Sequence, residues 1–209
     1  MFGIENYLGF LIGGIILNLT PGSDTIYILT RSISQGKKAG VYSVLGISTG
    51  GLSHTLLAAF GLSIILRTSE LAFNIVKIIG ALYLVYLGIK MLRDKSNLFT
   101  NIESARRNSL SKIYLQGFLT NLFNPKVALF FLSFLPQFIN AGQTKGPIPF
   151  LILGITFVTT GTIWCLILAY SSSLMTKTLR ENVRLGKYLQ KISGVIFLGL
   201  GLKIALKNN

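Results

Sequence analysis

The stretch Asn18-Leu19-Thr20-Pro21-Gly22-Ser23-Asp24, with its later counterpart Asn121-Leu122-Phe123-Asn124-Pro125-Lys126, decides the fold of this chain. Each stretch lies inside a long apolar segment, where a proline removes one helical hydrogen bond and clashes with the preceding turn. Thr20 and Asn124 are N-cap residues placed directly before a proline, which is a helix-start signal. We therefore expect both apolar helices to stop and restart at their prolines.

The composition around these stretches is that of a membrane protein. Of 209 residues, 51% are hydrophobic and 12% are charged, with a mean hydropathy of +0.62. A soluble domain carries about twice this share of charge. The net charge of +14 comes from basic residues placed between apolar runs, a pattern that favours anionic lipid over nucleic acid. The single cysteine, Cys165, excludes a disulfide framework or a cysteine metal site, and the N-terminus lacks the basic region of a cleaved signal peptide.

The apolar segments predict a single transmembrane domain over residues 1–209, all-α, with about six helices, each long enough for a bilayer core. It divides into a first three-helix repeat (1–92), a cytoplasmic loop (93–112) and a second three-helix repeat (113–209). A five-span alternative remains open if one interrupted segment does not cross. The six expected spans are Ile4–Thr30, Val41–Leu66, Leu71–Leu92, Ile113–Phe138, Ile148–Leu174 and Tyr188–Leu206.

The distribution of basic residues predicts the orientation. Fourteen of the 20 lysines and arginines fall in or beside the first, third and fifth connections. By the positive-inside rule these connections are cytoplasmic, and both termini are extracytoplasmic. The expected location is the cell (inner or plasma) membrane.

An internal repeat relates the two halves of the chain. Gly14 and Asn18 precede the first proline as Gly117 and Asn121 precede the second, and the third and sixth segments share a Lys-Ile-x-Gly pattern at Lys77 and Lys191. Three spans per half place the halves in opposite orientations, as in the inverted repeats of many secondary transporters. The alternative is convergent use of glycine, leucine and isoleucine in apolar helices.

In an inverted repeat the two restarted helices point their N-termini at the membrane centre. Such ends carry unpaired N–H groups and partial positive charge, which favour a carboxylate. Asn18 and Asn121, one turn before each break, add amide groups. The alternative is a pair of proline kinks that only help packing.

Two charged residues follow the breaks. Asp24 is a functional candidate because charge inside a membrane is costly; it can bind an ammonium group or carry a coupling proton. Alternatively it stabilises the first turn of its helix or lies near the cytoplasmic interface. Lys126 can meet a substrate carboxylate or pair with Asp24, unless it extends toward the membrane surface.

The second span contains the only histidine. His54 shares a helical face with Gly46 and Gly50, glycines that allow close helix packing. It is therefore a second proton-coupling candidate, although a lone membrane histidine more often has a structural role. We expect no metal site and no cofactor.

These residues give the chain a resemblance to the lysine exporter family, the LysE/RhtB type of amino-acid exporters. The resemblance rests on residues 18–24, on the glycine-rich run from Gly36 through Gly46 and Gly50, and on residues 117–126. Many relatives have Pro-Gly-Pro where this chain has Pro-Gly-Ser. The substrate-binding candidates in the matching motifs are Asn18, Pro21, Gly22, Asp24, Asn121, Asn124, Pro125 and Lys126.

The resemblance implies a secondary transporter, not an enzyme, that exports amino acids from the cytoplasm with the proton gradient. Asp24 is the single clear intramembrane acid, which favours small neutral substrates such as threonine or homoserine over basic ones. The alternatives are an exporter of basic amino acids and a metal-cation exporter. The expected partners are the amino acid and the lipid bilayer, with no nucleic acid; a homo-oligomer is compatible with the sequence.

Overall fold

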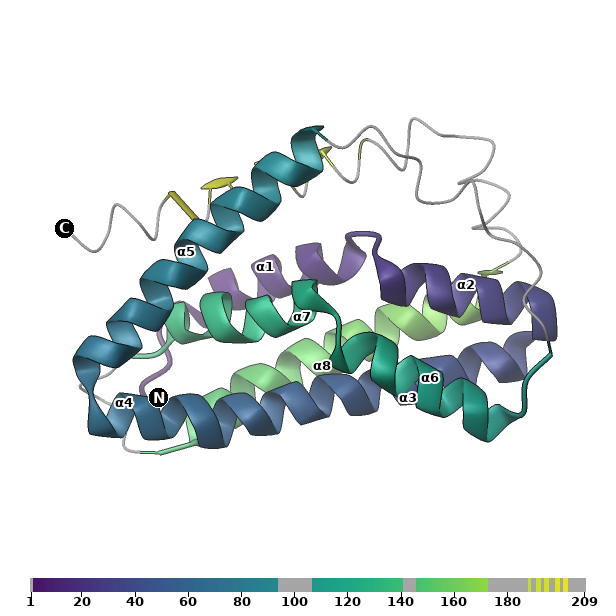
Figure 1. Ribbon diagram of the computed structural model, residues 1–209, viewed down its shortest axis with the longest axis horizontal. Helices are drawn as coiled ribbons and strands as arrows, with labels where there is room; N and C mark the ends of the chain where they lie inside the picture. Colours follow the sequence, from purple (N-terminus) through teal and green to yellow (C-terminus); the bar gives the residue numbers. More distant parts are fainter. Residues whose placement is uncertain are drawn as a thin grey trace.

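The computed structural model describes residues 2–93, 107–140 and 146–172, together with nine residues between 188 and 202. These residues form helices and no strands, apart from an isolated bridge between Ile4 and Ile139. The helices lie in an elongated bundle, along which α5 (Glu70–Arg93) runs at an angle (Figure 1). The predicted loop residues 94–106 and most of the predicted sixth span lie outside the described residues.

The distribution of side chains in the bundle is that of a membrane protein. Large apolar side chains face outward: Leu57, Leu71 and Phe123 are 63%, 72% and 76% exposed. Soluble monomers rarely expose broad apolar surface of this kind. The interior, in contrast, contains the polar side chains of Arg31, His54, Asn121 and Asn124. The all-α, polytopic membrane fold expected from the sequence is confirmed.

The first broken span consists of α1 (Tyr7–Leu19) and α2 (Ser23–Gln35). The break is where the sequence predicts it, but the predicted cap is wrong. Thr20 ends α1 instead of starting α2, since its N–H and its hydroxyl both donate to the Ile16 carbonyl, at 3.1 and 2.8 Å. Pro21 lies between the helices, and Gly22 is the N-cap of α2.

The fourth span is broken as predicted. It consists of α6 (Leu110–Leu122), then α7 (Pro125–Leu129), a π-helical turn η2 (Phe130–Phe134) and a 3-10 turn η3 (Leu135–Phe138). Asn124 is the N-cap, and its side-chain oxygen accepts from the Lys126 N–H at 3.0 Å. The parts before and after the break meet at 45°.

The two broken spans run in opposite directions. In Figure 1, α1 and α7 lie at one end of the bundle and α2 and α6 at the other. The chain passes from α1 to α2 in one direction and from α6 to α7 in the other, as an inverted repeat requires. Glycines of the matching third and sixth segments also pack together, since a Cβ on Gly88 would lie 2.7 Å from the Gly194 carbonyl oxygen.

Long helices surround the breaks. α3 (Lys37–Leu57) continues through the π-helical turn η1 (Ala58–Leu62) into α4 (Ser63–Thr68), and α8 (Ile148–Tyr170) is unbroken. In the described ranges, the segments Lys37–Leu66 and Ile148–Tyr170 are long and apolar enough to cross a membrane, and the bent fourth span adds a third crossing if counted as one. The number of six crossings stays a prediction.

The α3–α6 contact places the centre of the fourth span against the second. A Cβ on Gly46 would collide with the Tyr114 carbonyl oxygen and lie 2.8 Å from the Phe118 nitrogen, and one on Gly50 would lie 2.8 Å from Asn121. Both glycines are buried. Both therefore lie in the close contact between α3 and α6, and their assignment as helix-packing residues stays a prediction.

The substitution Gly46→Ala is expected to lower the stability of the protein by about 1–3 kcal/mol, because backbone atoms of α6 cannot move aside as a flexible side chain can. Thermal unfolding in detergent measures the effect. Gly61→Ala is the matched control, since a Cβ on Gly61 would meet no atom of the described residues within 4 Å. Equal unfolding temperatures for the two variants would contradict the close contact.

Candidate functional site

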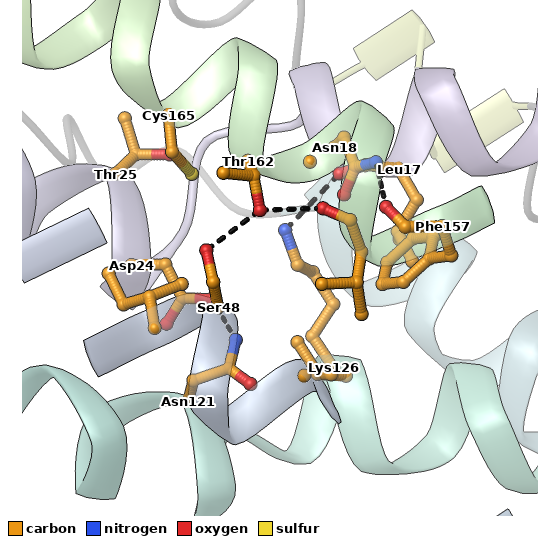
Figure 2. Close-up of a pocket in the computed structure, with 15 residues that line it drawn as sticks. Leu17, Asn18, Asp24, Thr25, Ser48, Asn121, Lys126, Phe157, Thr162 and Cys165 are labelled. Carbon is orange, nitrogen blue, oxygen red and sulfur yellow. Dashed lines mark hydrogen bonds between the residues drawn. The ribbon is translucent and has the colours of Figure 1, made fainter. Parts of the chain in front are cut away.

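A small cavity lies where the two breaks meet. Its volume is about 50 Å³. Residues from α1, α2, α3, α6, α7 and α8 line it, and Figure 2 shows their side chains converging from these elements. Its lining includes four of the predicted site residues, namely Asn18, Asp24, Asn121 and Lys126.

Asp24 and Asn121 form the acidic side of the cavity. Asp24 projects from the first turn of α2, and its Oδ2 accepts from Asn121 Nδ2 at 2.8 Å (Figure 2). Among the described residues, the other oxygen of each side chain, Asp24 Oδ1 and Asn121 Oδ1, is buried without a hydrogen-bond partner. Buried polar atoms are rarely left unpaired. A free carboxylate oxygen and a free amide oxygen suit a donor with positive charge, such as an ammonium group.

Lys126 lies at the opposite side of the cavity from Asp24 and binds the backbone at the first helix break. Its Nζ donates to the carbonyl oxygens of Leu17 and Thr20, at 3.3 and 3.0 Å. These carbonyls are at the C-terminal end of α1, and the Leu17 carbonyl also accepts from the Thr20 N–H at 3.2 Å. In the described ranges Lys126 forms no direct ion pair with Asp24, so one side of the cavity is positive and the other negative.

Asn18 connects the end of α1 to α8. Its Nδ2 donates to the Phe157 carbonyl at 3.3 Å and to Thr160 Oγ1 at 3.1 Å. A Cβ on Gly161 would lie 3.0 Å from Asn18 Oδ1, so the glycine gives this amide its space. Asn18 is thus held by the scaffold while it lines the cavity.

The remaining four motif residues shape the breaks and are not part of the cavity lining. Pro21 and Gly22 connect α1 to α2, and a Cβ on Gly22 would lie 3.3 Å from Lys126 Nζ. Asn124 caps α7, where Pro125 is the first residue. Any part of these four residues in substrate binding stays a prediction.

His54 lies behind the cavity rather than in its wall. Its Nε2 is 3.3 Å from the carbonyl oxygen of Asn121, and its ring stacks on Phe131 with 5.6 Å between centroids. It therefore contacts the backbone carbonyl of Asn121, the residue whose side-chain amide donates to Asp24. The proton-coupling role of His54 stays a prediction.

Sequence reasoning missed the contributions of α3 and α8. Ser48 and Thr162 hydrogen-bond across the cavity at 2.7 Å, and Phe157, Gly161 and Cys165 line it at four-residue spacing on α8. The available signal was the small polar run Thr159-Thr160-Gly161-Thr162 inside an apolar span. Alone, such a run is also typical of ordinary helix packing.

Among the described residues, no three side chains from histidine, cysteine, aspartate and glutamate are close enough to hold a metal ion.

Comparison with known proteins gives relatives over nearly the whole chain. A family model for the LysE type translocator matches residues 15–208. An uncharacterized membrane protein of Bacillus subtilis (strain 168), YrhP, is 31% identical over 97% of this chain and 100% of its own length. Proteins named leucine efflux protein from Klebsiella pneumoniae and Enterobacter are each 30% identical over 98% of this chain, and over 96% and 97% of their own lengths.

No solved structure matches the chain. The family match covers both helix breaks and all eight substrate-binding candidates. It agrees with the apolar exterior of the bundle, and a translocator family indicates a transporter, not an enzyme. The chain belongs to the LysE type translocator family.

Proposed function

We propose that this protein exports neutral amino acids from the cytoplasm and binds them as zwitterions between Asp24 and Lys126. The observation that carries the proposal is that one cavity has a carboxylate with an unpaired buried oxygen on one side and an ammonium group on the other. An amino acid has the complementary pair of charges. Its ammonium group fits the free oxygens of Asp24 and Asn121.

The substrate carboxylate is expected to bind Lys126. The ammonium group of Lys126 has three donors, of which two are directed at the Leu17 and Thr20 carbonyls. The third donor is available for a carboxylate without loss of either backbone contact. Burying charges is costly unless they are paired, so a zwitterion that pairs with both protein charges lowers the cost of all four.

The rest of the lining favours an uncharged side chain. Leu17, Val127, Phe157 and Val158 form an apolar wall, and Asp24 is the single acid among the lining residues. A basic side chain would need a second acid. The sequence suggested threonine or homoserine as examples of neutral substrates, whereas the apolar wall and the relatives named leucine efflux protein favour an aliphatic amino acid such as leucine.

The proposed orientation places one end of the cavity toward the cytoplasm. Arg31, Lys37 and Lys38 lie around the connection of α2 and α3, and Arg107 and Lys112 lie at the start of α6. Hydrogen bonds between Gln35 and Asn108 join these two regions, so the five charges belong to one end of the bundle. The positive-inside rule makes this end cytoplasmic. A proton that enters down a 100 mV potential supplies about 2.3 kcal/mol, with Asp24 as the proposed carrier.

Efflux from proteoliposomes tests the proposal. Vesicles preloaded with leucine, threonine or lysine are diluted into amino-acid-free buffer, with and without a pH gradient. Leucine is expected to leave fastest, lysine not above the protein-free background, and an acidic exterior to increase the rate of leucine efflux. Transport of cadmium or another cation without transport of any amino acid would overturn the proposal.

A further inference from the structure

Phenylalanines close one end of the cavity. We use the name phenylalanine cluster for Phe10, Phe130, Phe134, Phe138 and Phe157, which are all at most 8% exposed. The ring centroids of Phe10 lie 5.4–5.9 Å from those of Phe130, Phe134 and Phe138, and Phe130 stacks on Phe157 at 4.1 Å. Rings at these separations attract one another in addition to excluding water.

The phenylalanine cluster lies between the cavity and the end of the bundle that contains the N-terminus. Phe138, at its far side, receives a backbone hydrogen bond from the Glu5 N–H at 2.9 Å. Phe157, at its near side, lines the cavity. In the proposed orientation, a substrate must therefore pass the phenylalanine cluster to leave the cell.

The opposite end is closed by different chemistry. Arg31 donates to Gln35 Oε1 at 3.1 Å and to Gln116 Oε1 at 2.9 Å, and Asn108 donates to the same two oxygens at 3.1 and 3.3 Å. These polar groups can exchange their partners for cytoplasmic water when the helices separate. Phenylalanine rings that separate cannot form hydrogen bonds with water in place of their lost contacts. Opening toward the exterior is thus the step that needs energy from the substrate.

We propose that the phenylalanine cluster is the exterior gate of the transporter. The side chain of the substrate opens this gate by displacing Phe157. This inference rests on the proposed function. Phe157 is the one member of the cluster that lines the cavity, and it contacts Phe130 and also Phe131, at 5.6 Å. The cluster residues on η2 belong to a π-helical turn, a feature that often marks functional sites in helices.

The size of the cavity gives the physical reason. A volume of about 50 Å³ holds roughly three to five water molecules, which is about the room that the charged head group of an amino acid needs. A leucine side chain must displace part of the apolar wall, and a glycine need not. Displacement of Phe157 separates its ring from Phe130, so a large side chain opens the gate and a small one does not.

The opening of the gate can be measured at Cys165, so no further cysteine has to be introduced. Cys165 lines the cavity and is the only cysteine in the chain, so its reaction with a thiol reagent measures access to the cavity. A membrane-impermeant reagent is added outside to vesicles that contain no amino acid. In Phe157→Leu, the reaction is expected to be about tenfold faster than in the unsubstituted protein, since the stacking that closes the gate is lost.

Selectivity supplies the second readout. The unsubstituted protein is expected to export leucine faster than glycine, and Phe157→Leu is expected to lose most of this difference. Phe150→Leu is the matched control, because Phe150 is a fully buried phenylalanine on the same helix that does not line the cavity. Phe157→Met, which keeps most of the volume without the ring, serves if the leucine variant does not fold.

Unchanged labelling and unchanged selectivity in a folded Phe157 variant would overturn the inference, and so would the same changes in Phe150→Leu. The proposed function has a separate readout in the unsubstituted protein. There, leucine in the cavity should slow the reaction of Cys165 with a membrane-permeant reagent. Absence of this protection, together with absence of efflux, would refute the proposed function itself.

Discussion

Replacement of Asp24 by asparagine is expected to reduce amino-acid export about 100-fold, since loss of one partner of a buried charge pair costs several kcal/mol and each 1.4 kcal/mol is a factor of ten. The substitution keeps the size of the side chain and removes its charge. The Asn121 amide keeps a carbonyl oxygen to bond to, so the cavity keeps its shape. The free oxygen that we assign to the substrate ammonium group becomes neutral or is replaced by a donor. Leucine efflux from proteoliposomes measures the loss.

Membrane insertion and thermal stability of Asp24→Asn are expected to change little. Glu5→Gln is the matched control, since the same chemical change is made at an exposed carboxylate near the N-terminus, where Asn140 Nδ2 donates at 2.6 Å. This variant should export normally. Normal export by Asp24→Asn would return Asp24 to a structural role in the first turn of α2 and would remove the ammonium site from the proposal.

Replacement of Lys126 by methionine is expected to have two large effects. Export should fall about 100-fold, because the substrate carboxylate loses its charged partner. Stability should also fall, by about 1–3 kcal/mol, because the carbonyls of Leu17 and Thr20 lose a charged donor in an apolar environment. Efflux and thermal unfolding in detergent measure the two effects separately.

Lys112→Met is the control for Lys126→Met, because Lys112 is an exposed lysine at the start of α6. It should change neither export nor stability by a comparable amount. Lys126→Arg keeps the charge and the donors, so it should recover stability more fully than export, which depends on the position of a single charge. A fully active Lys126→Met variant would show that neither the break nor the substrate needs this ammonium group.

Much of the backbone plan is local and could be predicted. A proline inside a helix removes one hydrogen bond and clashes with the preceding turn. Breaks at Pro21 and Pro125 are therefore expected whatever the packing of the helices. Asn124 before Pro125 is a cap in sequence and in structure. Gly46 and Gly50 predicted a close helix contact because only glycine leaves room for the backbone of a neighbour.

The wrong cap at Thr20 has a physical reason. A threonine can end one helix by bonding back to a carbonyl four residues earlier or begin the next by capping it, and both choices follow the same sequence pattern. Here the Ile16 carbonyl takes both donors of Thr20, and the adjacent carbonyl oxygen of Thr20 accepts from Lys126. The second broken helix thus stabilises the first, across more than 100 positions in the chain.

The sequence by itself determined that this chain crosses a membrane, that two helices break at matching places, and that Asp24 and Lys126 follow the breaks. These features follow from local chemistry: apolar length, proline geometry and charge that is costly in lipid. Only the tertiary structure decided that Lys126 bonds to the end of α1, that Asp24 keeps an unpaired oxygen, and that Phe157 joins the cavity to the phenylalanine cluster. Each of these depends on which face of one helix meets another, and helix packing sets that relation between residues far apart in the chain.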